Sequence, residues 1–327
     1  MKHLLTRASA LLLISLALTP GEAAQRTKLH AAYSAESSWS LATWIAYEGG
    51  LYKKYGLDVD LVLIRSASTI TSALIAGEAP MIQLGGNGTI QAALQGADTV
   101  NILTLIPIIP QSLVVTADIK SADDLHGKRL GVSRFGALSD LVIRRYLRKF
   151  GLDPAKDVTI VQIGGIPELV TAMKAGAISG ASISPPALTV AKKVGFKELA
   201  DFESLDYKYP AVAIASTKSF IQRNRPSALN FIRGEIEGIH AIRTQKNFAI
   251  SVLKKYMRIN DADILEDGYR YALKFFQPRP YPTLDEVRAV LDEYKSMPQT
   301  ANAKPEQFID LTLLQELDRE KFFDKLK

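Results

Sequence analysis

The chain has 327 residues, of which 47% are hydrophobic and 23% charged, a composition typical of a folded globular protein. Its net charge of +6 is spread along the chain without a dense basic block, which argues against nucleic-acid binding. The absence of cysteine excludes disulfides, thiolate nucleophiles, zinc–thiolate sites and a lipid-modified cysteine.

Residues 1–23 have the pattern of a cleaved signal peptide. A basic start precedes an apolar run over residues 8–18, and the small residues Gly21 and Ala23 follow it. The apolar run is about half the length of a membrane span, so an uncleaved anchor is the weaker alternative. We therefore expect a soluble, periplasmic protein that carries no lipid anchor.

Short β patterns alternate with helical patterns along the mature chain. The first series predicts strands at 29–33, 58–64, 81–84 and 100–105, and helices at 41–48, 68–76 and 87–94. The second series predicts strands at 130–133, 157–163, 180–183 and 198–202, and helices at 137–150, 167–174 and 186–194. This alternation indicates βαβ units and parallel sheets. Beyond a strand at 211–215, the remaining chain is predicted to be almost wholly helical.

The two series predict an α/β protein with two lobes. We assign residues 27–116 to the first part of lobe 1, residues 117–211 to lobe 2, and residues 212–327 to the return to lobe 1 and the C-terminal helices. The β segments 113–116 and 211–215 flank the second series and are predicted to be two crossings between the lobes. Two crossings make a hinge, which places a ligand cleft between the lobes.

The sequence contains no recognisable catalytic or metal-binding set. The histidines of the mature chain, His30, His126 and His240, are widely separated. The segment Gly131–Phe135 resembles a nucleophile elbow but lacks its second glycine, and the glycine-rich segment 85–89 is not followed by the lysine of a phosphate-binding loop. We predict no enzyme activity, no metal and no cofactor.

Several strand-to-helix turns carry residues suited to binding a small ligand. In open α/β sheets, ligands bind at the carboxyl ends of strands, where helix N-termini offer free N–H groups. The candidate ligand-binding residues are Ser37, Ser38, Trp39, Gly85, Gly86, Asn87, Ser133, Arg134, Phe135 and Ser184. The alternative is plain architecture, because any parallel α/β protein needs glycines and N-caps at such turns. Trp39 could equally pack in the core, and Arg134 could equally be an exposed residue at a helix start.

Four segments resemble one family of binding proteins. Residues 44–59, WIAYEGGLYKKYGLDV, resemble the A-x-E-x-G-L-Y-x-K-x-G-L-D-V stretch of periplasmic substrate-binding proteins. These belong to importers of the nitrate/sulfonate/taurine type and are related to the proteins that bind thiamine-pyrimidine precursors. Ala73–Glu78, Asp118–Ser133 and Gly151–Val158 carry further matches, and together the segments cover residues 28–220.

The resemblance implies a type II periplasmic-binding-protein (Venus-flytrap) fold with a helical C-terminal tail. It implies capture of a small anion or heterocycle and its delivery to a membrane permease with an ATPase, with a monomer expected. Ligand contacts in this family come from loops that correspond to Ser37–Trp39, Gly85–Asn87 and Ser133–Phe135. Two alternatives remain open: a periplasmic sensor for a receptor, and a pyrimidine-synthase-like enzyme. The second is disfavoured because those relatives use a cysteine-rich motif.

Overall fold

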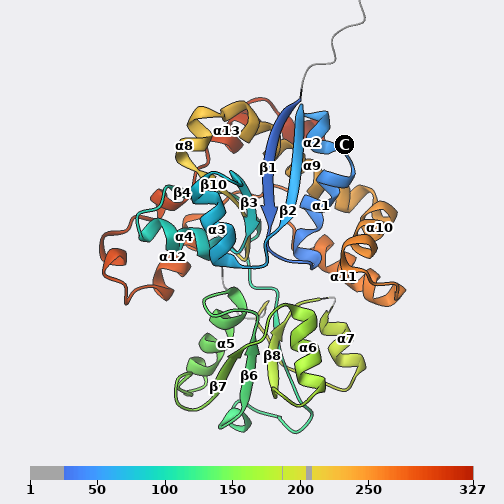
Figure 1. The fold of residues 1–327 in the computed structure, drawn as a ribbon, viewed down its shortest axis with the longest axis vertical. Helices are drawn as coiled ribbons and strands as arrows, with labels where there is room; N and C mark the ends of the chain where they lie inside the picture. Colours follow the sequence, from blue (N-terminus) through green and yellow to red (C-terminus); the bar gives the residue numbers. More distant parts are fainter. Residues whose placement is uncertain (1–25, 186, 204–207, 327) are drawn as a thin grey trace, which may run out of the picture.

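The structure, a computed structural model, describes residues 26–185, 187–203 and 208–326. These residues form two lobes, each with a five-stranded sheet and flanking helices (Figure 1). The predicted signal peptide, residues 1–23, lies outside the described residues. Within the described part of the chain, no helix combines the length and apolar composition needed to cross a bilayer.

The sheet of lobe 1 has the strand order β2-β1-β3-β10-β4. Its strands are β1 (Thr27–Tyr33), β2 (Leu57–Leu63), β3 (Met81–Leu84), β4 (Thr99–Ile106) and β10 (Val212–Thr217). β1 pairs in parallel with β2 and β3, whereas β10 lies antiparallel between β3 and β4. Every residue of β4 and β10 is buried, so the returning strand is part of the centre of this lobe.

The sheet of lobe 2 has the order β7-β6-β8-β5-β9. Its strands are β5 (Ser112–Val115), β6 (Arg129–Val132), β7 (Thr159–Gln162), β8 (Gly180–Ile183) and β9 (Lys197–Asp201). β6 pairs in parallel with β7 and β8, and β5 lies antiparallel between β8 and β9.

The structure differs from the sequence prediction at the crossings. Both sheets are mixed rather than wholly parallel, because the first strand after each crossing enters its sheet in the opposite direction. The segment 113–116 was expected to be a crossing in lobe 1, but β5 is a buried strand of the lobe 2 sheet. The segment 211–215 likewise falls largely within β10 of lobe 1. The lobe boundary at residue 116 is therefore too late, and the first crossing precedes Ser112.

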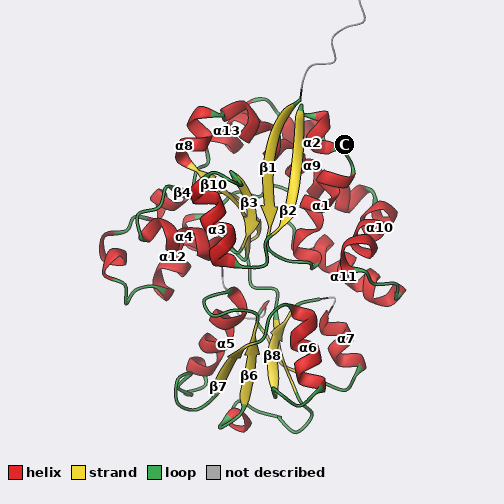
Figure 2. Cartoon of the chain, in the orientation of Figure 1, coloured by secondary structure: helices red, strands yellow, loops and turns green. Residues whose placement is uncertain are grey.

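Helices cover the two sheets (Figure 2). Lobe 2 contains η2 (Asp123–Leu125), α5 (Leu138–Lys149), α6 (Ile166–Lys174) and α7 (Ala187–Lys193). Before the crossing, lobe 1 contains η1 (Ser38–Ser40), α1 (Leu41–Glu48), α2 (Leu51–Lys54), α3 (Ala67–Ala76) and α4 (Gly86–Leu94). After the return it contains α8 (Lys218–Arg223), α9 (Arg225–Thr244), α10 (Lys246–Met257), α11 (Ala262–Phe275), α12 (Leu284–Glu293), η4 (Pro298–Asn302), η5 (Pro305–Phe308), α13 (Thr312–Arg319) and α14 (Phe322–Lys325).

The helices that follow the return complete the core of lobe 1. Trp44 of α1 is fully buried and stacks on Tyr256 of α10 with ring centroids 4.5 Å apart. Helix α9 packs directly on α1, since a Cβ at Gly238 would lie 2.4 Å from the Ala42 carbonyl oxygen. Glycine is required there because the two helix backbones approach so closely. These contacts bring α10 and α11 beside the first loops of the chain.

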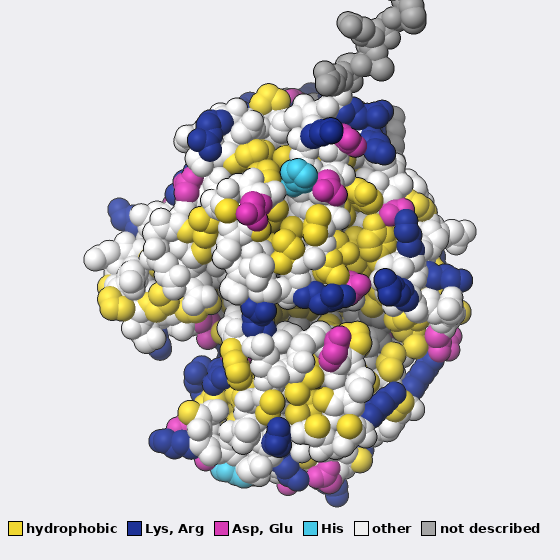
Figure 3. All heavy atoms as spheres, viewed as in Figure 1, with side chains coloured by type: hydrophobic (Ala, Val, Ile, Leu, Met, Phe, Trp, Pro, Cys, Tyr) yellow, Lys and Arg dark blue, Asp and Glu magenta, His cyan; other side chains and the backbone are white. Residues whose placement is uncertain are grey.

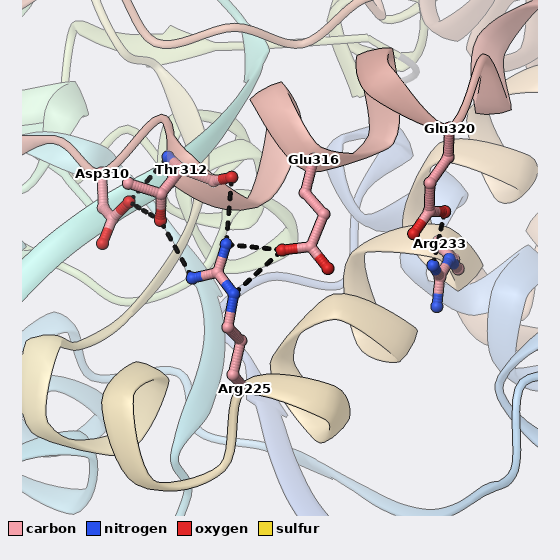
Figure 4. Close-up of polar contacts among 6 residues, drawn as sticks. All are labelled: Arg225, Arg233, Asp310, Thr312, Glu316 and Glu320. Atoms are coloured by element: carbon pink, nitrogen blue, oxygen red, sulfur yellow. Dashed lines mark hydrogen bonds and ion pairs between the residues drawn. The ribbon is translucent and has the colours of Figure 1, made fainter.

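The last residues of the chain form a strap, which we define as residues 309–325. Figure 4 shows Arg225 of α9 bonded to this strap: its guanidinium donates to Glu316 at 2.6 and 2.9 Å and to the Thr312 hydroxyl and carbonyl at 3.2 Å. Arg233 donates to Glu320 at 2.6 Å. The strap begins beside the β4 edge of the sheet, where the Asp310 N–H donates to a β4 carbonyl at 3.0 Å. It therefore covers the part of the β4 edge near Asn101, while residues 277–280 bond to Thr104 and Leu105 farther along the same edge.

Candidate functional site

The predicted binding turns lie at the ends of strands that run in parallel within each lobe. β1 and β3 end at Tyr33 and Leu84, whereas β6 and β8 end at Val132 and Ile183. The carboxyl ends of parallel strands lie at one edge of a sheet, so each lobe gathers its own turns. Contacts between turns of different lobes, described below, show that the two edges face each other across the lobe boundary, where the cleft is predicted (Figure 1).

The first turn is held by a buried amide of the neighbouring strand. Ser37 caps η1 by accepting the Trp39 N–H at 3.4 Å. The Gln83 side chain of β3 donates to the Trp39 carbonyl at 3.1 Å and accepts the Ser40 hydroxyl at 3.1 Å. Ser38 lies between these anchored residues with a fully buried hydroxyl that has no hydrogen-bond partner among the described residues. An unpaired buried hydroxyl costs about 1–3 kcal/mol, so this atom is suited to meet a ligand or a water.

The second turn begins α4 and reaches the other lobe. The Asn87 amide donates to the Gly136 carbonyl of lobe 2 at 3.5 Å. Asn101 of β4 donates to the Gly86 carbonyl at 3.2 Å and so fixes the start of the helix. A Cβ at Gly86 would lie 2.7 Å from the Asn101 amide nitrogen and 2.9 Å from Pro210. Packing against the second crossing therefore explains the glycine at 86 without a ligand.

The third turn, after β6, contains Arg134, the charged side chain among the predicted site residues. Arg134 donates to the hydroxyl of Ser68 in lobe 1 at 2.9 Å, and none of the ion pairs among the described residues includes it. The hydroxyls of Ser133 and Ser139 lie 2.8 Å apart, which ties the turn to α5. The Phe135 ring is 52% exposed, so in this arrangement it does not form the wall of a closed pocket.

The fourth turn supplies a second unpaired hydroxyl. Ser184 follows β8, and its carbonyl accepts the Leu188 N–H of α7 at 3.2 Å. Its side chain is fully buried, and its hydroxyl also lacks a hydrogen-bond partner among the described residues. Each lobe thus contributes one buried and unsatisfied serine hydroxyl from a predicted binding turn.

Sequence reasoning missed the residues that reach this region from elsewhere. Gln83 supports the first turn, and Tyr271 of α11 lies against the Trp39 side chain. Burial raises the pKa of Tyr271 well above its usual value, so its hydroxyl stays protonated. Tyr294, which follows α12, lies against Asn87, and burial raises its pKa as well. Nothing local marks these tyrosines in the sequence, because they lie about 200 residues after the turns they approach.

Two hollows in the surface lie away from these turns. One of about 290 Å³ lies between α3 and α8 and includes Asp98 and Arg223, and one of about 130 Å³ lies beside α9 and α14. Neither contains a predicted site residue. Among the residues that the structure describes, no three His, Asp or Glu side chains are grouped as a metal site would require.

The comparison with protein families gives a match over residues 40–246, to the profile described as NMT1/THI5 like. The chain belongs to the NMT1/THI5-like family.

Three relatives carry names that describe binding. A Bacillus subtilis protein named as a binding protein, YtlA, is 22% identical over 84% of this chain and 85% of its own. A Brachyspira hyodysenteriae protein named as an ABC transporter periplasmic binding protein is 23% identical, over 73% and 72%. The nitrate/nitrite binding protein NrtA of Nostoc is 26% identical, over 46% and 35%.

Solved structures share the same fold. A Bordetella bronchiseptica protein aligns with a TM-score of 0.81 at 18% identity, covering 91% of this chain and 98% of its own. The periplasmic aliphatic sulphonate binding protein SsuA of Escherichia coli aligns with a TM-score of 0.71 at 19% identity, covering 86% and 97%. The desulfurization enzyme DszB aligns with a TM-score of 0.65 at 14% identity, covering 90% and 100%. The predicted family resemblance and two-lobed fold are therefore confirmed, while the fold alone also accommodates an enzyme.

Proposed function

We propose that this protein is the solute-binding component of an ABC importer. One observation carries the proposal: two buried serine hydroxyls, Ser38 in lobe 1 and Ser184 in lobe 2, are unsatisfied at the facing ends of the two sheets. A solute that satisfied both would bridge the lobes and bind their closed arrangement best. The names of the family relatives agree with such a role.

The proposed partners and location follow from the same role. The protein works in the periplasm as a monomer after removal of residues 1–23, and passes its solute to a membrane permease driven by an ATPase. It performs no chemistry on the solute. The absence of cysteine supports binding over a pyrimidine-synthase-like activity. A sensor that feeds a receptor would use the same cleft, and the presence of adjacent permease and ATPase genes would favour the importer.

The proposed ligand is a small anion or an anionic heterocycle. Arg134 supports this choice, because it faces lobe 1 without a carboxylate partner among the described residues and can donate to a sulfonate, carboxylate or nitrate-like group. Several Lys and Arg side chains also line the boundary between the lobes on the face shown in Figure 3. Ser37, Ser38, Gly85, Asn87, Ser133 and Ser184 would supply the neutral polar contacts, with Trp39 and Phe135 beside an apolar portion.

The first test is native mass spectrometry of the protein as isolated from the periplasm, followed by thermal shifts with alkanesulfonates, nitrate, aromatic carboxylates and pyrimidines. A ligand that binds only the folded state raises the melting temperature, and the rise grows with the ratio of the ligand concentration to its Kd. A retained molecule or a shift would support the proposal and identify the ligand class. No retained molecule and no shift across the panel would contradict it.

Variants then test the site with the ligand so identified. Ser38→Ala and Ser184→Ala should each weaken binding about five- to thirty-fold, since each removes a hydrogen bond of about 1–2 kcal/mol. Neither should destabilise the free protein, in which these hydroxyls bond to nothing described. Ser40→Ala is the matched control and should lower stability, because the Ser40 hydroxyl donates to the Ala35 carbonyl at 2.7 Å.

Arg134 and Trp39, two further predicted site residues, are tested in the same way. Arg134→Ala and Trp39→Ala should lower affinity without unfolding the protein, whereas Arg144→Ala, which breaks a pair with Asp140 inside α5, should leave affinity unchanged. Unchanged affinity in both test variants would remove the assigned site while leaving the fold in place.

A further inference from the structure

The lobes also touch outside the cleft, through polar and charged side chains. Lys193, at the end of α7, lies 3.1 Å from Asp261 and 3.6 Å from Asp263 at the start of α11. The Thr189 hydroxyl of α7 donates to Asp267 of α11. We call these five residues the α7–α11 clasp. Figure 1 shows the two helices facing each other across the boundary between the lobes.

Two further ion pairs cross the same boundary. On the clasp side, Lys274 of α11 lies 2.6 Å from Glu203, which follows β9. On the opposite side of the molecule, Arg145 of α5 lies 2.8 Å from Glu293 of α12 (Figure 1). Charged contacts therefore flank the boundary between the lobes on both sides, and a hinge opening that moves α7 away from α11 separates the clasp.

The contacts between α7 and α11 at the clasp are made by charged and polar side chains. Val194, which follows Lys193 in the chain, remains 44% exposed. Lys193 is 45% exposed and Asp261 43% exposed, so salt can reach and screen their interaction. The hydrogen bond to Asp261 raises the pKa of Lys193, so the lysine is charged at neutral pH.

From this geometry we propose that the α7–α11 clasp is an electrostatic latch, which biases the ligand-free protein toward the closed arrangement. An exposed ion pair changes an equilibrium by up to about five-fold, so two or three such pairs can shift an open–closed ratio more than ten-fold. The link to ligand affinity rests on the proposed function. If only the closed arrangement holds ligand fully, apparent affinity falls with the closed fraction, and the latch makes solute capture depend on ionic strength.

The absence of cysteine allows a direct measurement of the lobe separation. Spin labels on Glu78→Cys in lobe 1 and Lys174→Cys in lobe 2 occupy exposed positions away from the cleft. Protein unfolded and refolded to remove carried-over ligand is then examined by pulsed electron paramagnetic resonance at about 20 mM and about 1 M NaCl, where the Debye length falls from about 20 Å to about 3 Å.

A matched pair of variants separates the latch from a general charge effect. Lys193→Gln removes the central cation of the clasp, whereas Lys192→Gln removes its neighbour on α7, whose partner Glu198 lies in the same lobe. We expect the distance distribution to lengthen in high salt and in Lys193→Gln at low salt, and to stay unchanged in Lys192→Gln. Melting temperatures of both variants verify that they fold.

Two results would overturn the latch: distances that respond to neither salt nor Lys193→Gln, or an equal response in Lys192→Gln. This experiment uses no ligand, so it does not depend on the thermal-shift panel. If no compound of the thermal-shift panel binds, the proposed function is contradicted and the latch is not. If the distances do not respond to salt, the latch is contradicted and the proposed function is not.

Discussion

Glu235 is a buried carboxyl that the cleft does not use. It lies in α9 with no exposed surface, and accepts hydrogen bonds from the Tyr52 hydroxyl and, at 3.1 Å, from the Thr43 hydroxyl. No described cation pairs with it, and burial raises its pKa to about 7. The folded protein therefore holds a proton on this carboxyl through a pH range in which the unfolded chain has lost it.

This difference makes stability depend on pH, with a definite sign. Because the folded pKa is higher than the unfolded value of 4.5, the folded state binds more protons between pH 4.5 and about 7. Glu235 thus contributes full stability below pH 4.5, and that contribution is lost as the pH rises through about 7. Glu235→Gln keeps a neutral hydrogen-bonding group and should be more stable than the parent at pH 8 by about 3 kcal/mol, at 1.4 kcal/mol per pKa unit.

The measurement is urea unfolding of both proteins at pH 5 and pH 8. The stability advantage of Glu235→Gln should appear at pH 8 and shrink toward pH 5. Glu237→Gln, two residues away on the same helix and paired with Lys54 at the surface, is the control and should show no such pattern. An equal effect of Glu235→Gln at both pH values would refute the explanation by ionisation.

At the scale of elements, the strap depends on one well-connected arginine. Arg225 contacts both the carboxylate of Glu316 and the start of α13 at Thr312 (Figure 4). The strap in turn buries Leu313, Leu314 and Leu317. Removing the guanidinium leaves Glu316 half-buried without its partner and frees the end of the strap from α9.

Arg225→Ala should therefore destabilise lobe 1 by about 1–2 kcal/mol, which lowers the melting temperature by a few degrees in a protein of this size. Loosening the strap also uncovers the part of the β4 edge near Asn101, so heated samples of this variant should aggregate sooner than the parent. The control is Arg223→Ala, an arginine two residues earlier that does not touch the strap. A melting temperature of Arg225→Ala equal to that of the control would show that the strap is held by its leucines alone.

The sequence predicts these elements well where their cause is local. The helices at 41–48 and 137–150 were recognised from apolar spacing and closing glycines, and both are present within a residue or so. The sequence also predicts a strand at 113–116 but not its lobe, because a four-residue segment with three apolar side chains carries no information about which sheet it joins. Strand direction at the crossings depends on partners more than 60 residues away, such as β8 for β5.

The residues of the candidate site also fall into those that the local sequence predicts and those that it does not. Turn residues such as Ser38 and Arg134 could be chosen because strand ends and helix starts have a local signature. Tyr271 and Tyr294 could not, because their place beside those turns results from the packing of α11 and α12 on lobe 1. Gln83 could not either, because its contact with the first turn depends on the pairing of β3 with β1. The glycine at 86 was chosen for ligand approach, but its neighbours Asn101 and Pro210 give it a packing role instead.

At the scale of the whole molecule, the two lobes differ in how the chain builds them. All strands of lobe 2 come from the continuous stretch 112–201. The chain segment of lobe 2 interrupts that of lobe 1. Strand β10, which lies between β3 and β4, comes from residues 212–217, which follow lobe 2 in the sequence. The β3 and β4 strands therefore have no direct contact in the sheet and depend on a segment made more than 100 residues later.

This insertion sets an order of events during folding. Lobe 2 can complete its sheet from consecutive residues, whereas lobe 1 must wait for a distant strand, and closing such long loops slows folding. In refolding followed by pulsed hydrogen exchange, amides of β6 should gain protection before those of β10, and simultaneous protection would contradict this order. During synthesis, which starts at the N-terminus, the sheet formed by the first hundred residues would stay incomplete until residues 212–217 have been made. Insertion of β10 would then be the step that commits the whole molecule to its native state.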